Sequence, residues 1–336
     1  AGSGMTPERL HVTGCPRFDY ASRRWEGTLD FSRRDYILVN ANFPLVNPRF
    51  ARSPDEEQAT LVKAGWRPDY VAQMLADSRG ILRNYIETVR GLATVLPDRT
   101  FLVRPHPFEN DELYRESFAT CGNVVVDGQG SVLNVIRNAA CVVHLNCGTA
   151  VEATMLRRLP VSLEFLNTRH MANHSTLPSK VSLRVDSFEA ALEVLRDLPA
   201  ATANFDFSGN YESLIHPWFH ANDGSAADRV AEAVLTALGT VPRRPAGGVA
   251  RSLASSRRNS RVGQRLQAAL ANVVGSRVTS ELRAKLAASR REKALSLPTV
   301  VAQLTALAAH EGRAPATVSA ARHPWTGLPL ASLLVT

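Results

Sequence analysis

Two short motifs in this sequence carry the side chains best suited to holding a negatively charged group. The first, VRPHPFEN at 103–110, places Arg104 and His106 each directly before a proline and after an apolar run. Because proline restricts the residue before it, both side chains are held on an extended backbone. The guanidinium of Arg104 can bind a phosphate through two N–H groups at once, and the imidazole of His106 can donate one hydrogen bond to it. Taken alone, this motif favours a structural turn with a surface histidine.

The second motif, NCGT at 146–149, lies between an apolar run and a helix expected to begin near Thr149. A small residue such as Gly148 lets backbone N–H groups approach a ligand, and the N-terminus of a helix attracts negative charge. Glu152 lies one turn into that helix. It can pair with Thr149 in a capping box or accept sugar hydroxyls, and the two roles are compatible.

The stretch from Phe101 to Leu159 supplies the elements that would position both motifs. Its short apolar runs and loops predict strand, loop, strand, helix, strand, helix, which is the layout of a parallel α/β sheet. In such sheets ligands bind beyond the carboxyl ends of the strands. We therefore expect one anion-binding site for a diphosphate or nucleotide phosphate, formed by two loops on adjacent strands. Its predicted members are Arg104, His106, Glu109, Asn146, Gly148 and Thr149.

The flanking segments extend this sheet on both sides. A strand at 36–39 ends in the polar residues Asn40 and Asn42, and the apolar spacing at 68–96 predicts a long amphipathic helix. Loops are expected at 43–66 and 167–180. Further strands are predicted at 11–14, 160–165 and the start of 181–199, whose remainder is expected to be helical.

His170 and His174 lie four residues apart in the segment NTRHMANHSTLPSK. That spacing suits a pair of metal ligands only on a helix, and Pro178 together with the absence of an apolar period predicts a loop. We therefore expect no metal site here. A last helix of this part is expected from Ser225, which is a good N-cap.

The net charge of +8 is unevenly distributed along the 336 residues. Residues 1–240 carry 24 Lys/Arg against 28 Asp/Glu, whereas residues 241–300 carry 13 Lys/Arg against two Asp/Glu. Such a basic segment can bind nucleic acid or an anionic membrane surface, or can form a solvated helical face. It lacks the interleaved aromatic side chains of a base-stacking surface, so nucleic acid is the least expected partner.

The composition also narrows the class of protein. No apolar run approaches the ~20 residues that span a bilayer, and the first residues lack the pattern of a signal peptide. The four cysteines have no metal-binding spacing and are expected to be buried free thiols in a reducing compartment. We therefore expect a cytoplasmic protein, with peripheral contact to the inner face of the membrane through 241–300 as one role of the basic segment.

Five blocks of the sequence occur in a characteristic order. They are VTGCPRFD at 12–19, NANFPLVNPR at 40–49, VRPHPFEN at 103–110, GSVLNVIRNAACVVHLNCGTAVEA at 130–153 and DGSAADRVAEAV at 223–234. In their order and spacing they resemble the surface carbohydrate biosynthesis family of bacteria, whose members have the two-domain GT-B glycosyltransferase architecture. The resemblance extends over roughly residues 8–238.

The resemblance implies a role for each matching position. In related enzymes that use CMP-activated sugars, a His-Pro motif and a Ser/Thr-rich loop hold the donor nucleotide, and here His106, Gly148 and Thr149 stand at those positions. Similar proteins carry two threonines in that loop; with Gly148 in place of the first, one hydroxyl is missing. Glu152 matches a glutamate that lies near the donor in GT-B enzymes. Asn40 and Asn42, at the start of the second block, are also predicted to bind the substrate.

The implied architecture is the donor-binding, C-terminal half of a GT-B fold: a Rossmann-like parallel sheet followed by a helical extension. VTGCPRFD normally follows an acceptor domain, so we expect that domain to be missing and name no catalytic residue. We divide the chain into an interdomain segment (1–20), a nucleotide-sugar-binding domain (21–239), a basic linker (240–262) and a helical extension (263–336), the last residues of which, from Gly312, are expected to be irregular.

Three functions from different classes follow from these observations. The favoured one is a glycosyltransferase that moves an activated sugar, with a CMP-sugar as the preferred donor, onto a polysaccharide or lipid-linked acceptor. It would need no cofactor and no metal, because no DxD-type pair lies near the motifs. The alternatives are a CDP-glycerol-type phosphotransferase, which also pairs RPHP with a Ser/Thr loop, and a non-catalytic binding protein with a basic tail.

Overall fold

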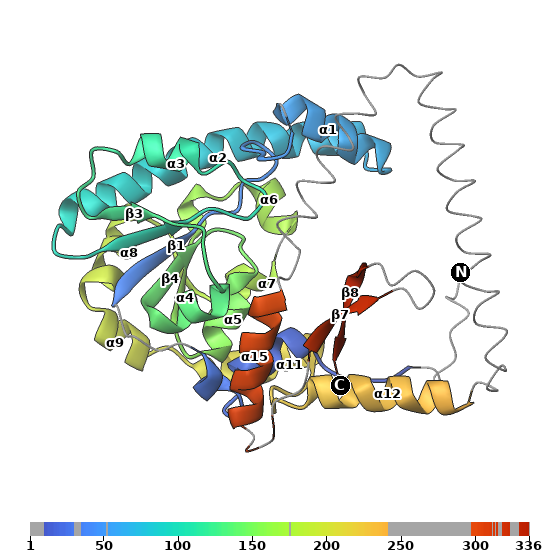
Figure 1. Ribbon diagram of the computed structural model, residues 1–336. Coiled ribbons are helices and arrows are strands. Elements are labelled where there is room, and N and C mark those ends of the chain that lie inside the picture. Colours follow the sequence, from blue (N-terminus) through green and yellow to red (C-terminus); the bar gives the residue numbers. More distant parts are fainter. Residues whose placement is uncertain are drawn as a thin grey trace, which may run out of the picture. The chain divides into compact units, whose positions relative to one another are not determined.

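The computed structural model describes residues 10–29, 35–51, 53–174, 176–240, 297–310, 312, 314, 318–322 and 329–335. The chain divides into two compact units, Ala1–Val230 and Ala231–Thr336. The first contains the parallel sheet, and the second contains the end of a helix that begins at Ala226, a further helix and a two-stranded hairpin (Figure 1).

The sheet of the first unit has six parallel strands in the order β3-β2-β1-β4-β5-β6. The order reverses direction between β1 and β4, which gives the doubly wound arrangement of Rossmann-like folds and confirms the predicted fold class. The strands are β1 (Tyr36–Asn40), β2 (Phe101–Arg104), β3 (Val124–Val126), β4 (Ala139–His144), β5 (Leu159–Leu163) and β6 (Leu183–Val185).

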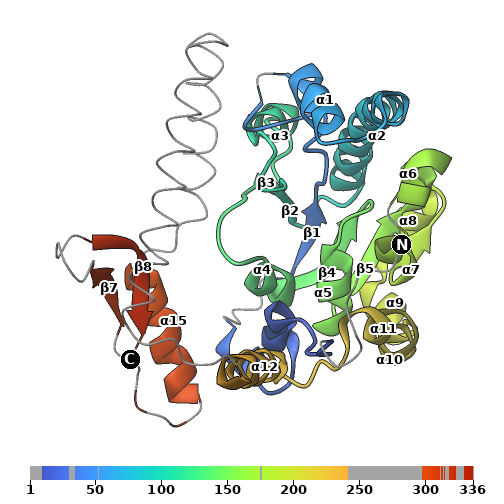
Figure 2. The same cartoon turned by 90° about the vertical axis from the view of Figure 1, so that its right-hand side faces the viewer.

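Helices cover both faces of this sheet, which is why its central strands are apolar on both sides. The side chains of Ile37 and Val39 in β1 belong to one buried cluster, and Tyr36 and Leu38 belong to another on the opposite face. Figure 2 shows α2 on one side of β1 and α4 and α5 on the other. The principal helices are α1 (Pro54–Lys63), α2 (Pro68–Val95), α3 (Glu112–Ser117), α4 (Val132–Asn138), α5 (Thr149–Met155), α8 (Phe188–Arg196) and α12 (Ala226–Thr240).

Shorter helical segments fill the connections. They are η2 (Pro16–Ala21), η3 (Glu26–Thr28), η4 (Glu164–Leu166), α6 (Arg169–His174), α7 (Leu177–Lys180), α9 (Leu198–Ala203), α10 (Phe207–Asn210), the π-helical η5 (Tyr211–Ile215) and α11 (His216–Phe219). Among the described residues, no helix is long and apolar enough to cross a membrane.

Several predicted elements differ from the structure. Residues 11–14 form no strand and instead run as an irregular segment into η2. The expected loop at 43–66 contains α1, whose N-cap Ser53 accepts a hydrogen bond from Glu56 N and whose first turn is acidic. The expected loop at 167–180 contains α6 and α7, because a proline is well tolerated in the first turn of a helix such as α7.

The second unit confirms one prediction and corrects another. The helical extension expected at 263–336 contains α15 (Leu297–His310). The C-terminal residues are not irregular, because β7 (Val318–Arg322) and β8 (Pro329–Val335) pair in antiparallel fashion. The predicted linker at 240–262, except for Thr240 at the end of α12, and the start of the helical extension, residues 263–296, lie outside the described residues.

Candidate functional site

The two motifs lie at the carboxyl edge of the sheet, on either side of β1. In the strand register, Asn40 at the end of β1 lies beside Arg104 of β2 and beside His144 of β4. The two loops are therefore not on adjacent strands as expected, because β1 separates them. Two strand spacings amount to about 10 Å, a distance that a nucleotide diphosphate can bridge.

The loop after β4 turns through Asn146, whose φ of 52° lies in the left-handed region. Asparagine tolerates this conformation better than most residues, and three hydrogen bonds with two neighbouring side chains hold it in place. Asn42 Nδ2 donates to the Asn146 carbonyl over 2.9 Å, and the amides of Asn146 and Asn167 exchange hydrogen bonds of 3.0 and 3.2 Å. Asn42 therefore ties the β1 loop to the β4 loop.

Gly148 presents a backbone N–H group that has no hydrogen-bond partner within the part of the chain that the structure describes, whereas the N–H of Thr149 faces the sulfur of Cys147. The next two N–H groups are occupied, because Ala150 N donates to Cys147 O and Val151 N donates to Gly148 O. No atom lies within 4 Å of the place where a Cβ on Gly148 would stand. An anion could thus approach this turn directly, even though α5, with seven residues, is too short to contribute much of a dipole.

Asn40 links the end of β1 to the same turn. Its Nδ2 donates to Thr149 Oγ1 over 2.8 Å, and Cys147 Sγ contacts that hydroxyl at 3.1 Å. The Asn40 side chain is only 3% exposed, yet its Oδ1 has no hydrogen-bond partner among the described residues. A buried carbonyl without a donor is costly, so this oxygen is available to a ligand N–H or O–H. Burial raises the pKa of Cys147, which makes its thiol a poor nucleophile.

His144 supports the loop from beneath, and the sequence interpretation missed it. Its imidazole is fully buried, with Nε2 at 2.8 Å from the hydroxyl of Ser182. Because that hydroxyl donates to Pro178 O, it must accept from Nε2–H, which leaves Nδ1 to face Cys147 N at 3.5 Å. Burial lowers the pKa of His144 to about 4, so the ring is neutral at pH 7. In the sequence, His144 ends an apolar run shortly before the NCGT motif, and this position could have indicated its role.

Across β1, His106 presents one ring nitrogen to the edge. Its Nδ1 accepts from Phe108 N at 3.2 Å, so in the neutral ring Nε2 carries the proton and can donate to a ligand. Burial lowers the pKa of His106. Arg104 donates to the carbonyls of Gln129 and Gly130 over 2.6 and 2.8 Å and thereby holds the loop after β3. The guanidinium group of Arg104 thus lies at the carboxyl edge of the sheet, but two of its nitrogens already donate hydrogen bonds within the protein.

Glu109 and Glu152 are both buried and both engaged within the protein. The carboxylate of Glu109 accepts from Tyr114 Oη at 2.5 Å and from His106 N at 2.8 Å, which shapes the RPHP loop. Glu152 accepts from Arg17 Nε at 2.6 Å. Burial raises the pKa of both carboxyl groups. No side chain caps the N-terminus of α5, so the Thr149–Glu152 capping box is not formed.

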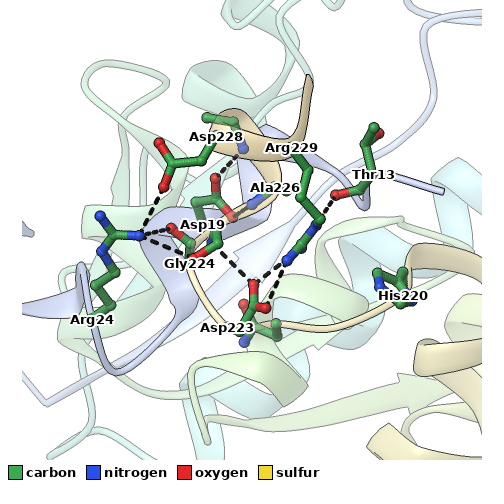
Figure 3. Close-up of polar contacts among 12 residues, drawn as sticks. Thr13, Asp19, Arg24, His220, Asp223, Gly224, Ala226, Asp228 and Arg229 are labelled. Atoms are coloured by element: carbon green, nitrogen blue, oxygen red, sulfur yellow. Dashed lines mark hydrogen bonds and ion pairs between the residues drawn. The ribbon is translucent and has the colours of Figure 1, made fainter. Parts of the chain in front are cut away.

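The first and last of the five sequence blocks interlock at the start of α12 (Figure 3). The carboxylate of Asp19 accepts hydrogen bonds from Ala226 N at 3.0 Å and Ala227 N at 2.8 Å, so Asp19 caps α12. The expected cap, Ser225, instead has its hydroxyl bonded to Arg24 Nη1 at 3.0 Å.

The pair Asp223 and Arg229 closes the same joint. Arg229 binds Asp223 through two hydrogen bonds of 2.7 and 3.0 Å and also donates to Thr13 O (Figure 3). The hydrogen bond from Arg229 lowers the pKa of Asp223 to about 2. Residues 12–19 and 223–229 therefore have a structural role in this unit.

His170 and His174 lie on α6, and hence on a helix, contrary to the prediction. His174 Nδ1 lies 2.9 Å from Tyr70 Oη, and the ring of His170 lies with its centroid 4.5 Å from that of Tyr70, the two planes tilted by 57°. No group of three or more His, Cys, Asp or Glu side chains that could hold a metal ion occurs in the described part of the chain.

Comparison with known proteins gives only distant structural likenesses. No family model matches this sequence, and no curated protein matches it. A UDP-GlcNAc 2-epimerase from Methanocaldococcus jannaschii is 13% identical over 69% of this chain and 56% of its own, with a TM-score of 0.39. A UDP-GlcNAc 2-epimerase from Neisseria meningitidis is 12% identical over 69% of this chain and 56% of its own, with a TM-score of 0.37.

The wall teichoic acid polymerase TagF is 13% identical over 70% of this chain and 52% of its own, with a TM-score of 0.41. This chain thus spans about half the length of these structures. Likenesses of this size transfer no activity. The α/β class rests on the sheet of this chain itself.

Proposed function

We propose that this chain binds the nucleotide part of an activated sugar and forms the donor-binding part of a glycosyltransferase of bacterial surface polysaccharide synthesis. The observation that carries the proposal is the turn at Gly148 and Thr149, where the Gly148 N–H and the buried Oδ1 of Asn40, whose amide is bonded to Thr149, both have no partner among the described residues. A site that is already built but lacks donors and acceptors for some of its groups is suited to a polar ligand.

In this proposal the phosphate of the nucleotide lies against Gly148 and Thr149, and His106 donates from the far side of β1 through Nε2. Both sets of donors are fixed by the fold before the ligand arrives: His144 and Asn42 hold one loop, and Glu109 holds the other. Preorganised donors of this kind stabilise the charge that develops on a leaving phosphate as a glycosidic bond breaks. The acceptor, and the group that activates it, are not assigned to this chain.

The sequence resemblance favours a CMP-sugar as the donor, with a CDP-linked group as the alternative. A cytidine nucleotide carrying one phosphate would contact mainly one of the two loops, whereas a diphosphate can reach both across β1. Titration of the protein with CMP, CDP and UDP, followed by calorimetry, therefore tests both the proposal and the phosphate count.

Substitution separates the site from unspecific binding of anions. His106→Ala and Thr149→Val are each expected to weaken nucleotide binding by about tenfold, because the first removes a hydrogen-bond donor to a charged group and the second removes the hydroxyl that holds the Asn40 amide at the turn. His11→Ala serves as the control, since His11 is exposed and lies in the irregular segment before η2. Equal binding by all four proteins, or no binding of any nucleotide by the wild type, would overturn the proposal.

Product analysis distinguishes the two transferase classes once a nucleotide binds. A glycosyltransferase cleaves the bond between the sugar and the phosphate, so CMP or a nucleoside diphosphate leaves without the sugar. A CDP-glycerol-type phosphotransferase transfers glycerol phosphate and releases CMP.

A further inference from the structure

A pocket of about 250 Å³ lies at the same edge of the sheet, bordered by α2, α6 and the loops that follow β1 and β4. Most of its wall is apolar and much of that wall is deeply buried, which distinguishes it from an ordinary surface depression. The apolar residues that line it include Phe43, Leu45, Met74, Ile81, Leu145 and Met171.

Its polar lining consists of two amides, a hydroxyl and an imidazole. Asn42 and Asn146 belong to the bridge between the two loops, and Ser78 of α2 is only 4% exposed. His174 is held at 2.9 Å by Tyr70 Oη. The described lining includes no Lys, Arg, Asp or Glu, so this pocket offers no charge to a phosphate or a carboxylate.

The pocket is within reach of a group attached to a phosphate at Gly148. Gly148 follows Asn146 by two residues, and two residues span at most about 7 Å. A substituent on the sugar ring of a donor bound at Gly148 and Thr149 can therefore enter the pocket next to Asn146.

We propose that this pocket receives an N-acyl group on the donor sugar, so that the chain selects acylamino sugars over sugars with a hydroxyl at that position. This inference rests on the proposed donor-binding function. An N-acyl group combines an apolar methyl with an amide, which matches an apolar wall bordered by the Ser78 hydroxyl and the Asn42 amide; the Asn146 amide is already paired with Asn167. A hydroxyl alone would leave the apolar wall unfilled and place a polar group against it.

The test compares pairs of nucleotide sugars that differ only in this group. UDP-GlcNAc is compared with UDP-glucose, and CMP-N-acetylneuraminate with its 5-hydroxy analogue, by calorimetry on the wild-type chain. The acylated member of the pair with the accepted nucleotide is expected to bind about four- to tenfold more tightly, as the burial of one methyl and its amide predicts.

Ser78→Leu, which fills the pocket, is expected to abolish this difference while binding of the free nucleotide stays unchanged. Asn134→Leu is the matched control, because Asn134 lines a separate groove of about 500 Å³ beside β2 and β3. It should keep the difference.

The outcomes separate the two proposals. If nucleotides bind and both members of each pair bind equally to the wild-type chain, the inference is wrong and the donor-binding function stands. A difference that survives in Ser78→Leu would also overturn the inference, since the acyl group would then be recognised elsewhere. If no nucleotide or nucleotide sugar binds, the donor-binding function fails and the inference fails with it. The comparison on the wild-type protein decides the matter even if Ser78→Leu does not fold.

Discussion

His144 shows how a single buried side chain can hold a surface loop in one conformation. Its ring spans from Ser182, beneath the loop, to the backbone of Cys147, and it remains neutral because burial lowers its pKa to about 4. The turn that contains Gly148 and Thr149 therefore depends on the neutral imidazole of His144, because burial disfavours its protonation.

This dependence predicts an acid-sensitive fold. In the unfolded chain His144 takes up a proton as the pH falls below its ordinary pKa of 6.5, whereas in the folded chain it does so only near pH 4. The free energy of unfolding should thus fall by about 3 kcal/mol between pH 7 and pH 4 because of this one group. His144→Gln should remove that part of the pH dependence, as measured by urea denaturation at pH 7.0, 5.5 and 4.5. Identical pH slopes for the two proteins would contradict the role assigned to His144.

At the scale of elements, the fold joins segments about two hundred residues apart at the start of α12. Asp19 lies in η2 and accepts from both Ala226 N and Ala227 N, while Gly224 packs closely against the turn that follows η2. A Cβ on Gly224, whose φ is +77°, would come within 2.5 Å of Ser22 Oγ. The sequence blocks at 12–19 and 223–234 thus have a structural role here, because they bond to each other.

Removal of the Asp19 cap should destabilise the first unit measurably. Asp19→Ala leaves two N–H groups at the start of α12 without an acceptor, at an expected cost of about 1–2 kcal/mol in the free energy of unfolding. Asp228→Ala is the matched control, because the Asp228 carboxylate is 69% exposed and forms an ion pair with Arg24 at the surface. Its cost should stay below about 1 kcal/mol. Denaturation curves in which the control loses as much as Asp19→Ala would refute the capping role.

At the scale of the whole molecule, charge is separated along the chain. The 24 Lys/Arg of residues 1–240 are outnumbered by 28 Asp/Glu, whereas residues 241–300 hold 13 Lys/Arg and two Asp/Glu. Binding of an anionic surface and binding of a nucleotide should therefore depend on different parts of the sequence.

Neutralisation of part of the basic segment in the full chain tests this separation. The fourfold variant Arg257→Gln, Arg258→Gln, Arg261→Gln and Arg265→Gln should lower partitioning onto vesicles with 30% phosphatidylserine by at least about tenfold, since each basic residue near such a surface contributes about 1 kcal/mol. Wild-type binding should also weaken as salt rises. Nucleotide affinity should not change. Equal partitioning of the two proteins in sedimentation assays would rule out a membrane role for these arginines.

The sequence by itself was sufficient to predict the six strands of the sheet and to place the two motifs at strand ends, although it also predicted a strand at 11–14 that the structure lacks. Buried strands are continuous apolar runs, and the long amphipathic pattern of α2 has one dominant period, so local sequence decides both. Residues at strand ends, such as Arg104 and Asn146, could be assigned to one edge because all strands of a parallel sheet point the same way. Short helices such as α6 escaped prediction, because one or two turns carry too little periodic signal.

The partners of each side chain were decided only by the tertiary structure. The capping of α12 by Asp19 joins residues 207 positions apart, the bond from Arg17 to Glu152 joins residues 135 apart, and the contact of His144 with Ser182 joins residues 38 apart. The strand order was likewise beyond local sequence, and it placed β1 between the two motifs. Hydrogen bonds between remote segments depend on how the chain packs as a whole, and no spacing along the sequence encodes them.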